Sequence, residues 1–168
     1  MIEKEFPKRK PTRLKDFDYN QAGAYFVTVC TEHRENTLSV VGGDAPQIEL
    51  LPYGKIADRC VNQLRNFYED ITVDRYVIMP NHIHVILILS DNGASRTSPP
   101  TRQHSRVSSF VSTFKRFCNK EYGRNIWQTS FHDHIIRNQK DYEEYVNYIY
   151  YNPVRWHLDE LYTEEGEE

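Results

Sequence analysis

The middle of the chain carries the stretch Val77-Ile-Met-Pro-Asn-His-Ile-His-Val-Ile-Leu-Ile-Leu89, one of its most apolar segments. Residues 71–79 and 82–89 are rich in β-branched side chains, which favour strands. The Pro80-Asn81 dipeptide between the two runs is typical of a tight turn. The two runs are therefore predicted to pair as an antiparallel hairpin.

The segments on both sides of this hairpin predict the rest of the architecture. Strand-forming residues occupy 25–30, residues 126–136 are expected to be extended, and apolar residues recur at helical spacing over about 55–68, 107–118 and 142–151. The last helix should end near Asn152, because the residue before Pro153 is disfavoured in the α region. The order β, α, β, β, α, β, α predicts an α+β fold, a ferredoxin-like antiparallel sheet with helices on one face and an extra C-terminal helix.

Length and charge suggest one domain between two charged ends. The chain has 168 residues, which suits a single core, assigned here to residues 21–158. Its net charge of −3 averages over opposite ends: the first fifteen residues carry six Lys or Arg, and the last twelve carry six acids. Residues 1–20 are predicted to be a basic arm that could follow a phosphate backbone, and 159–168 an acidic tail. Both ends could equally be solvated tails.

Some classes of protein are disfavoured by the composition. No stretch approaches the roughly 20 apolar residues that span a bilayer, and the charged start does not resemble a signal peptide, so a cytoplasmic protein is expected. Cys30, Cys60 and Cys118 form no Cys-x-x-Cys pair, so reduced thiols are expected rather than a disulfide framework or a cysteine zinc site.

The pair His82 and His84 is the first candidate for chemistry. Residues two apart in a strand point to the same face, so both imidazoles could hold one ion while Ile83 enters the core on the other side. The alternative is two histidines on a solvated sheet face. A second such pair, His132 and His134, surrounds an acid among polar neighbours and ranks second as a metal site.

The last predicted helix places Tyr145, Tyr148 and Asn152 on one face, because they are three and four residues apart. A tyrosine hydroxyl and an amide could therefore meet the same ligand. The alternative is a packing stripe, since this end of the chain is rich in tyrosine.

Four ordered motifs resemble the HUH single-strand transposases of the IS200/IS605 type, most closely the REP-associated tyrosine transposase branch. These motifs are Tyr25-Phe-Val-Thr-Val29, Met79-Pro-Asn-His-Ile-His-Val85, Trp127-Gln-Thr-Ser-Phe-His-Asp-His-Ile-Ile-Arg137 and Tyr148-Ile-Tyr-Tyr-Asn-Pro-Val154. The resemblance covers most of the chain. It implies a ferredoxin-like sheet with the two histidines on a central strand and the reactive tyrosine on a following helix.

The resemblance also implies roles for single residues. His82 and His84 match the metal-binding histidines, Tyr148 the nucleophile, and Asn152 the polar residue that completes the protein ligands. Insertion-sequence enzymes usually have glutamine at this last position, so asparagine resembles the REP-associated branch. After Pro153 the family usually continues with a small residue and glycine, whereas this chain continues with Val154 and Arg155.

The activity implied is that of a metal-dependent single-stranded DNA endonuclease and strand transferase. Tyrosine attack would give a 5′-phosphotyrosine at hairpin-bearing sequences such as REP elements, with Mg²⁺ or Mn²⁺ as the cofactor and the protein a monomer or homodimer. Zinc would also bind imidazole. The candidate DNA contacts are Lys8, Arg9, Lys10, Arg13, Lys115, Arg116, Lys120, Trp127 and Arg137.

Two other classes share this pattern. One is an HUH nickase of replication or conjugation, which the motifs around Trp127 and Asn152 disfavour. The other is a non-catalytic or domesticated nucleic-acid-binding module on the same fold, which an intact set of His82, His84 and Tyr148 disfavours.

Overall fold

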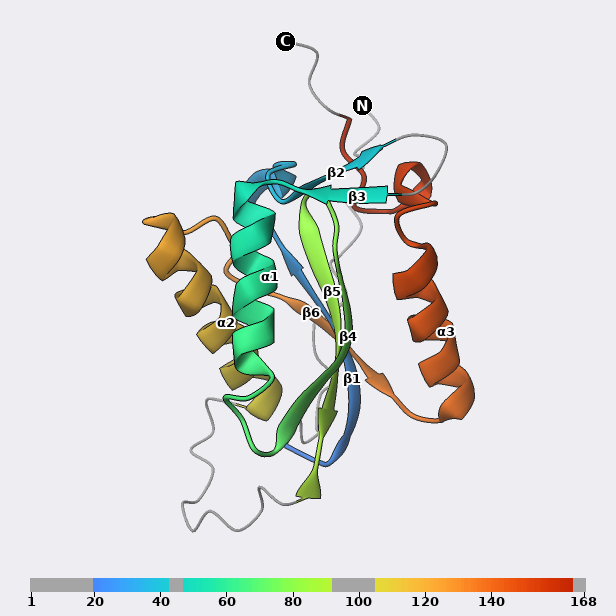
Figure 1. Cartoon of the computed structure of the whole chain (residues 1–168). Helices are drawn as coiled ribbons and strands as arrows, with labels where there is room; N and C mark the ends of the chain where they lie inside the picture. The colour runs from blue at the N-terminus through green and yellow to red at the C-terminus, as the bar shows by residue number, and fades with distance from the viewer. Residues whose placement is uncertain (1–19, 43–46, 92–104, 165–168) are drawn as a thin grey trace, which may run out of the picture.

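A four-stranded antiparallel sheet forms the centre of the molecule (Figure 1). The computed structural model describes residues 20–42, 47–91 and 105–164. The sheet order is β4 (Ile71–Ile78), β5 (His82–Leu89), β1 (Gly23–Cys30) and β6 (His132–Ile136). This order, with the chain order of strands and helices, confirms the predicted ferredoxin-like α+β fold.

Helices cover both faces of this sheet. One face packs against α1 (Pro52–Leu64) and α2 (Arg106–Tyr122), and α3 (Gln139–Tyr151), the extra C-terminal helix, lies on the other face (Figure 1). A two-stranded ribbon, β2 (Ser39–Gly42) with β3 (Gln47–Leu50), lies between β1 and α1 in the chain. Two short 3₁₀ turns, Glu32–Arg34 and Trp156–Leu158, complete the described structure.

Most predicted elements are observed, with shifted ends. The hairpin is confirmed as β4 and β5, which pair antiparallel around the Pro80-Asn81 turn. The first helix begins at Pro52 rather than at 55, because proline suits the first helical position, and it ends at Leu64 rather than at 68. Residues 126–136 were predicted to be extended, but only 132–136 join the sheet. Trp127 forms an isolated bridge with Thr31. The β2–β3 ribbon was not predicted.

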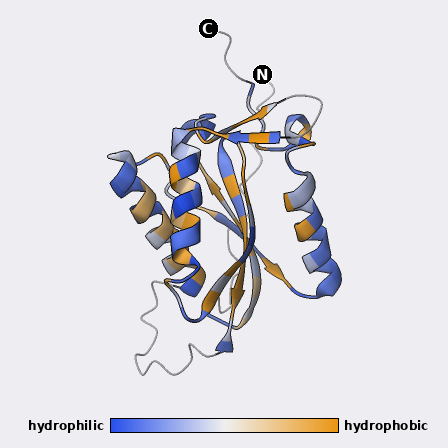
Figure 2. Ribbon diagram, viewed as in Figure 1, coloured by the Kyte–Doolittle hydropathy of each residue, from blue (hydrophilic) through white to orange (hydrophobic). Residues whose placement is uncertain are grey.

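The alternation of side chains along the strands produces two separate cores. Apolar residues concentrate along the strands (Figure 2). Ile83, Val85 and Leu87 of β5 enter the larger core beneath α1 and α2. Ile86 enters a smaller core beneath α3. Ile83 therefore packs in a core, as predicted, while its histidine neighbours face α3.

Two further expectations concern the cysteines and the membrane. The three cysteines are buried thiols. Within the described ranges, no helix has both the length and the apolar character needed to cross a bilayer.

Helix α1 packs so closely against the backbone of Leu38 that there is no space for a side chain at Gly54. A Cβ at Gly54 would lie 1.9 Å from the carbonyl oxygen of Leu38. That oxygen also accepts a hydrogen bond from the Leu51 amide at 2.9 Å, so it cannot move away without breaking this contact.

We predict that Gly54→Ala lowers the free energy of unfolding by about 3 kcal/mol, the upper end of the range for overpacking. Urea denaturation of the purified variant measures this change. Gly42→Ala is the matched control, because nothing lies within 4 Å of a Cβ there. Equal stability of the two variants would show that the Leu38 carbonyl does not constrain α1.

Candidate active site

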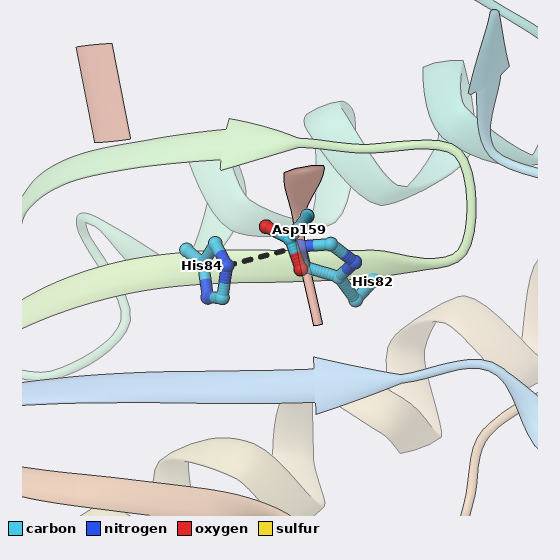
Figure 3. Close-up of side chains that lie close together, drawn as sticks. All are labelled: His82, His84 and Asp159. Carbon is cyan, nitrogen blue, oxygen red and sulfur yellow. Dashed lines mark hydrogen bonds between the residues drawn. The ribbon is translucent and has the colours of Figure 1, made fainter. Parts of the chain in front are cut away.

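Two buried histidines meet on the α3 face of the sheet. His82 and His84 are 0% and 3% exposed, and their Nε2 atoms lie 2.9 Å apart (Figure 3). Both come from β5, whose neighbours β4 and β1 fix its position on either side. Two imidazole nitrogens that bind one ion at about 2.1 Å and at right angles lie about 3.0 Å apart, so this pair fits a shared cation.

The other ring nitrogen of each histidine is anchored. The Nδ1 of His82 lies 2.8 Å from the Oδ1 of Asn81, and the Nδ1 of His84 lies 2.8 Å from the Oγ1 of Thr28. An amide oxygen only accepts, so Nδ1 of His82 donates and its Nε2 keeps a lone pair. The Thr28 hydroxyl either donates or accepts, which lets His84 carry its proton on either nitrogen. Contacts of this kind orient imidazoles as metal ligands.

Burial keeps both imidazoles neutral. It lowers the pKa of His82 to about 4, against a smaller raising effect of Asp159 and with a further lowering effect of Arg34. Burial and the neighbouring His82 hold the pKa of His84 well below its usual value. Neutral imidazole is the form that binds metal ions.

A carboxylate joins this pair to the tyrosine helix. The Oδ2 of Asp159 accepts hydrogen bonds from the Tyr148 hydroxyl at 3.0 Å and from the Asn152 Nδ2 at 2.6 Å. Asp159 also offers an oxygen that lies with the nitrogens of His82 and His84 in a group whose atoms are all within 4.8 Å of one another (Figure 3). The structure thus brings His82, His84, Tyr148 and Asn152 together around a fifth residue, Asp159.

Tyr148 is protonated at neutral pH. Partial burial raises the pKa of its phenol above the ordinary value, and the negative charge of Asp159 raises it further. The side chain is 42% exposed, and its ring lies 5.2 Å from that of His84. The residue is therefore half-exposed, while its hydroxyl has a fixed acceptor.

Asn152 lies where α3 ends and is 3% exposed. Its Oδ1 is buried and has no hydrogen-bond partner among the described residues. A buried acceptor without a partner is costly, so this oxygen fits a ligand atom for a cation. The donor set comprises two imidazole nitrogens, an amide oxygen and a carboxylate, which suits a divalent metal.

Tyr148 separates two hollows of the surface. One cavity of about 580 Å³ is lined by Phe26, Thr28, Arg34, His84, His132, Tyr145, Tyr148, Asp159, Glu160 and Leu161. The other, of about 750 Å³, is lined by Glu144, Asn147, Tyr148, Tyr151, Asn152, Arg155, Leu158, Asp159 and Glu160. Tyr148, Asp159 and Glu160 therefore line both cavities.

Few of the predicted DNA contacts lie near this site. Lys115 donates from Nζ to the carbonyl oxygens of Gln128, Thr129 and Ser130 at 2.6, 3.3 and 3.3 Å, which holds that loop. Trp127 is 1% exposed and packs on Phe114, so its indole leaves no face for a base.

The remaining predicted DNA contacts lie on α2, after β6 or outside the described residues. Arg116 and Lys120 are exposed on α2, across the sheet from α3, and Arg137 is exposed just after β6 (Figure 1). Lys8, Arg9, Lys10 and Arg13 lie outside the described residues.

His132 and His134, the second histidine pair, lie in different environments. His132 lines the cavity that contains His84 and Tyr148. His134 lies 3.3 Å from the carboxylate of Asp141, with its ring 4.9 Å from that of Tyr145. Among the described residues, neither His132 nor His134 belongs to a group that could hold a metal.

No role was predicted for four residues of the site: Thr28, Arg34, Asn81 and Asp159. Thr28 and Asn81 lie inside the motifs that pointed to the family, and their polar side chains in apolar runs were an available signal. Asp159 was assigned to the acidic tail, and its position eleven residues after Tyr148 follows no periodic pattern.

The fold and the arrangement of histidines and tyrosine define the chain as a tyrosine transposase of the HUH class. A REP-associated tyrosine transposase of Escherichia coli is 31% identical over 137 residues, which cover 82% of this chain and 70% of the relative. The chain belongs to the family of REP-associated tyrosine transposases.

A solved structure agrees with this assignment. The solved structure of a REP-associated tyrosine transposase bound to a REP hairpin superposes with a TM-score of 0.62 at 25% identity, over 86% of this chain and 73% of that one. An uncharacterized protein of Haemophilus influenzae is 28% identical over 171 residues, 93% of this chain and 94% of the relative. No protein-family model matches the chain.

The depressed pKa of His82 predicts a pH-dependent stability of the metal-free protein. The unfolded histidine takes up a proton near pH 6.5, whereas the folded one does so only near its pKa of about 4. The unfolded state therefore binds more protons in this window, and the free energy of unfolding should fall by up to about 3 kcal/mol on acidification from 6.5 to 4.

Urea denaturation in a chelator at several pH values measures this effect. His82→Gln should reduce the dependence to the part that the depressed pKa of His84 contributes, and His157→Gln, at an exposed position, should leave it unchanged. A wild-type slope retained in His82→Gln would contradict the assignment.

Proposed function

We propose that the protein is a metal-dependent single-stranded DNA endonuclease and strand transferase that uses Tyr148 as its nucleophile. One observation carries this proposal: the Tyr148 hydroxyl and the His82–His84 pair converge on the same carboxylate, that of Asp159. Because a neighbour in fold was solved with a REP hairpin, we infer that the substrate is single-stranded DNA bearing hairpins such as REP elements.

The proposed metal site consists of His82, His84 and Asn152, with the Asp159 carboxylate as a further ligand. The Nε2 lone pair of His82 and the buried Oδ1 of Asn152 support this set. Amide and carboxylate oxygens favour Mg²⁺ or Mn²⁺ over softer metals, and two imidazoles favour Mn²⁺ of these two. The chemistry that such an ion supplies when bound is polarisation of a non-bridging phosphate oxygen and neutralisation of its charge.

The chain's own groups account for the covalent step. The Tyr148 oxygen forms a bond to phosphorus while the bond from phosphorus to the 3′ oxygen breaks, which leaves a 5′-phosphotyrosine and a free 3′-hydroxyl. The phenol proton must leave on attack, and Asp159 already accepts its hydrogen bond. A 3′-hydroxyl from the same or another strand reverses the step and joins DNA without ATP, because the phosphodiester energy is retained.

The basic segment 1–20 is a further proposed contact with the phosphate backbone. Residues 1–19 lie outside the described part of the chain, so the proposal rests on the six Lys or Arg residues among the first fifteen.

We predict that Tyr148→Phe abolishes covalent attachment to DNA while DNA binding is retained, because only the hydroxyl is removed. A denaturing gel with labelled hairpin-bearing single strands and Mn²⁺ or Mg²⁺ detects the adduct as a slow band. Tyr150→Phe is the matched control, since this ring is 73% exposed and two residues away. His82→Ala should weaken the adduct by at least about tenfold through loss of a ligand.

Two results would contradict this function. An adduct that persists in Tyr148→Phe would exclude Tyr148 as the nucleophile. Binding without any adduct across a broad pool of hairpins would favour the non-catalytic module on the same fold.

A further inference from the structure

Arg34 supplies a positive charge to the cavity in which the Tyr148 hydroxyl and His84 are found. Among the described residues that line this cavity of about 580 Å³, Arg34 is the only Arg or Lys. Two of the other lining residues, Asp159 and Glu160, are acidic. A phosphodiester that enters this cavity needs a cationic partner from the chain, and Arg34 is the permanently charged candidate.

The backbone at this position is strained. His33 and Arg34 have φ angles of 55° and 56°, a left-handed conformation that costs a residue other than glycine about 1 kcal/mol or more. Two consecutive residues of this kind persist only where the surroundings hold them, and such positions cluster at functional sites.

The loop that carries Arg34 is held at both ends by the turn that precedes His82. The Thr31 amide and hydroxyl donate to the Asn81 carbonyl at 2.9 and 3.0 Å, and the Leu38 amide donates to the Pro80 carbonyl at 2.9 Å. The Asn81 side chain also donates to the Arg34 carbonyl at 3.3 Å. The same turn therefore fixes the positions of both Arg34 and His82.

The guanidinium is available for a ligand. The Arg34 side chain is exposed. None of the ion pairs formed by the described residues includes Arg34, so no carboxylate oxygen of these residues lies within 4.0 Å of its guanidinium nitrogens. Its Nη1 donates to the Glu160 carbonyl oxygen at 3.5 Å, the limit of a hydrogen bond.

We propose that Arg34 binds the phosphate that Tyr148 attacks, holding its non-bridging oxygens by the two parallel N–H groups of the guanidinium. This inference rests on the function proposed above and adds a phosphate-binding residue to it. The planar fork of an arginine matches a phosphate, and it is worth most when the charge on those oxygens grows during the reaction.

The test compares Arg34→Gln, Arg34→Lys and the control Arg124→Gln, whose guanidinium lies over Tyr53 at 5.6 Å, outside the cavity. With hairpin-bearing single strands and Mn²⁺, we expect Arg34→Gln to lower the rate of adduct formation at saturating DNA by about 100-fold. Arg34→Lys should restore part of this rate, because it keeps the charge but not the fork.

Binding supplies a second readout that does not depend on turnover. In a Tyr148→Phe background, Arg34→Gln should reduce the slope of log Kd against log salt by about 0.7, the value for one phosphate contact on a single strand. Isothermal titration with Mn²⁺ should give the same affinity as the parent protein, which shows that the histidine pair is intact.

The outcomes separate this inference from the proposed function. A wild-type protein that forms no adduct overturns the proposed function, and the salt dependence still tests Arg34. Wild-type rates and salt slope in Arg34→Gln overturn the assignment of Arg34. A loss of Mn²⁺ affinity in Arg34→Gln also overturns it, because the residue would then act only by shaping the site.

Discussion

The Nε2 atoms of His82 and His84 lie only 2.9 Å apart on the central strand β5, and the rest of the structure depends on this close contact. Two lone pairs repel at this distance unless a proton or a cation lies between them. The Thr28 hydroxyl on β1 permits either case for His84, while Asn81 fixes His82 in one tautomer. The sheet supplies the rigidity, since β5 pairs along its length with both neighbours.

The segment after α3 completes the site through long-range contacts. Pro153 follows the end of the helix, and the chain then turns so that the Trp156 ring lies 5.7 Å from that of His82. The Asn81 Nδ2 donates to the Leu161 carbonyl at 2.8 Å, and the Asp159 carboxylate meets Tyr148. One buried amide, that of Asn81, therefore orients a histidine and anchors the segment that brings Asp159 to it.

The sequence predicted what depends on local periodicity. The alternation in β5 placed His82 and His84 on one face, and the three- and four-residue spacing in α3 placed Tyr148 near Asn152. Asp159 and Arg34 could not be predicted in this way, because the first depends on contacts across more than 70 residues and the second on a left-handed loop. Trp127 was predicted to contact DNA because it is aromatic, but its ring is buried in the core.

The identity of the attacking tyrosine can be read directly from the covalent product. The segment Asp141–Arg155 follows Lys140 and contains five tyrosines, so trypsin releases all five in a single peptide. After reaction with DNA and nuclease digestion, tandem mass spectrometry of this peptide locates the residue that carries the remaining nucleotide. The structure predicts Tyr148. A nucleotide on Tyr145, Tyr150 or Tyr151 would contradict the role of the site built around His82, His84 and Asp159.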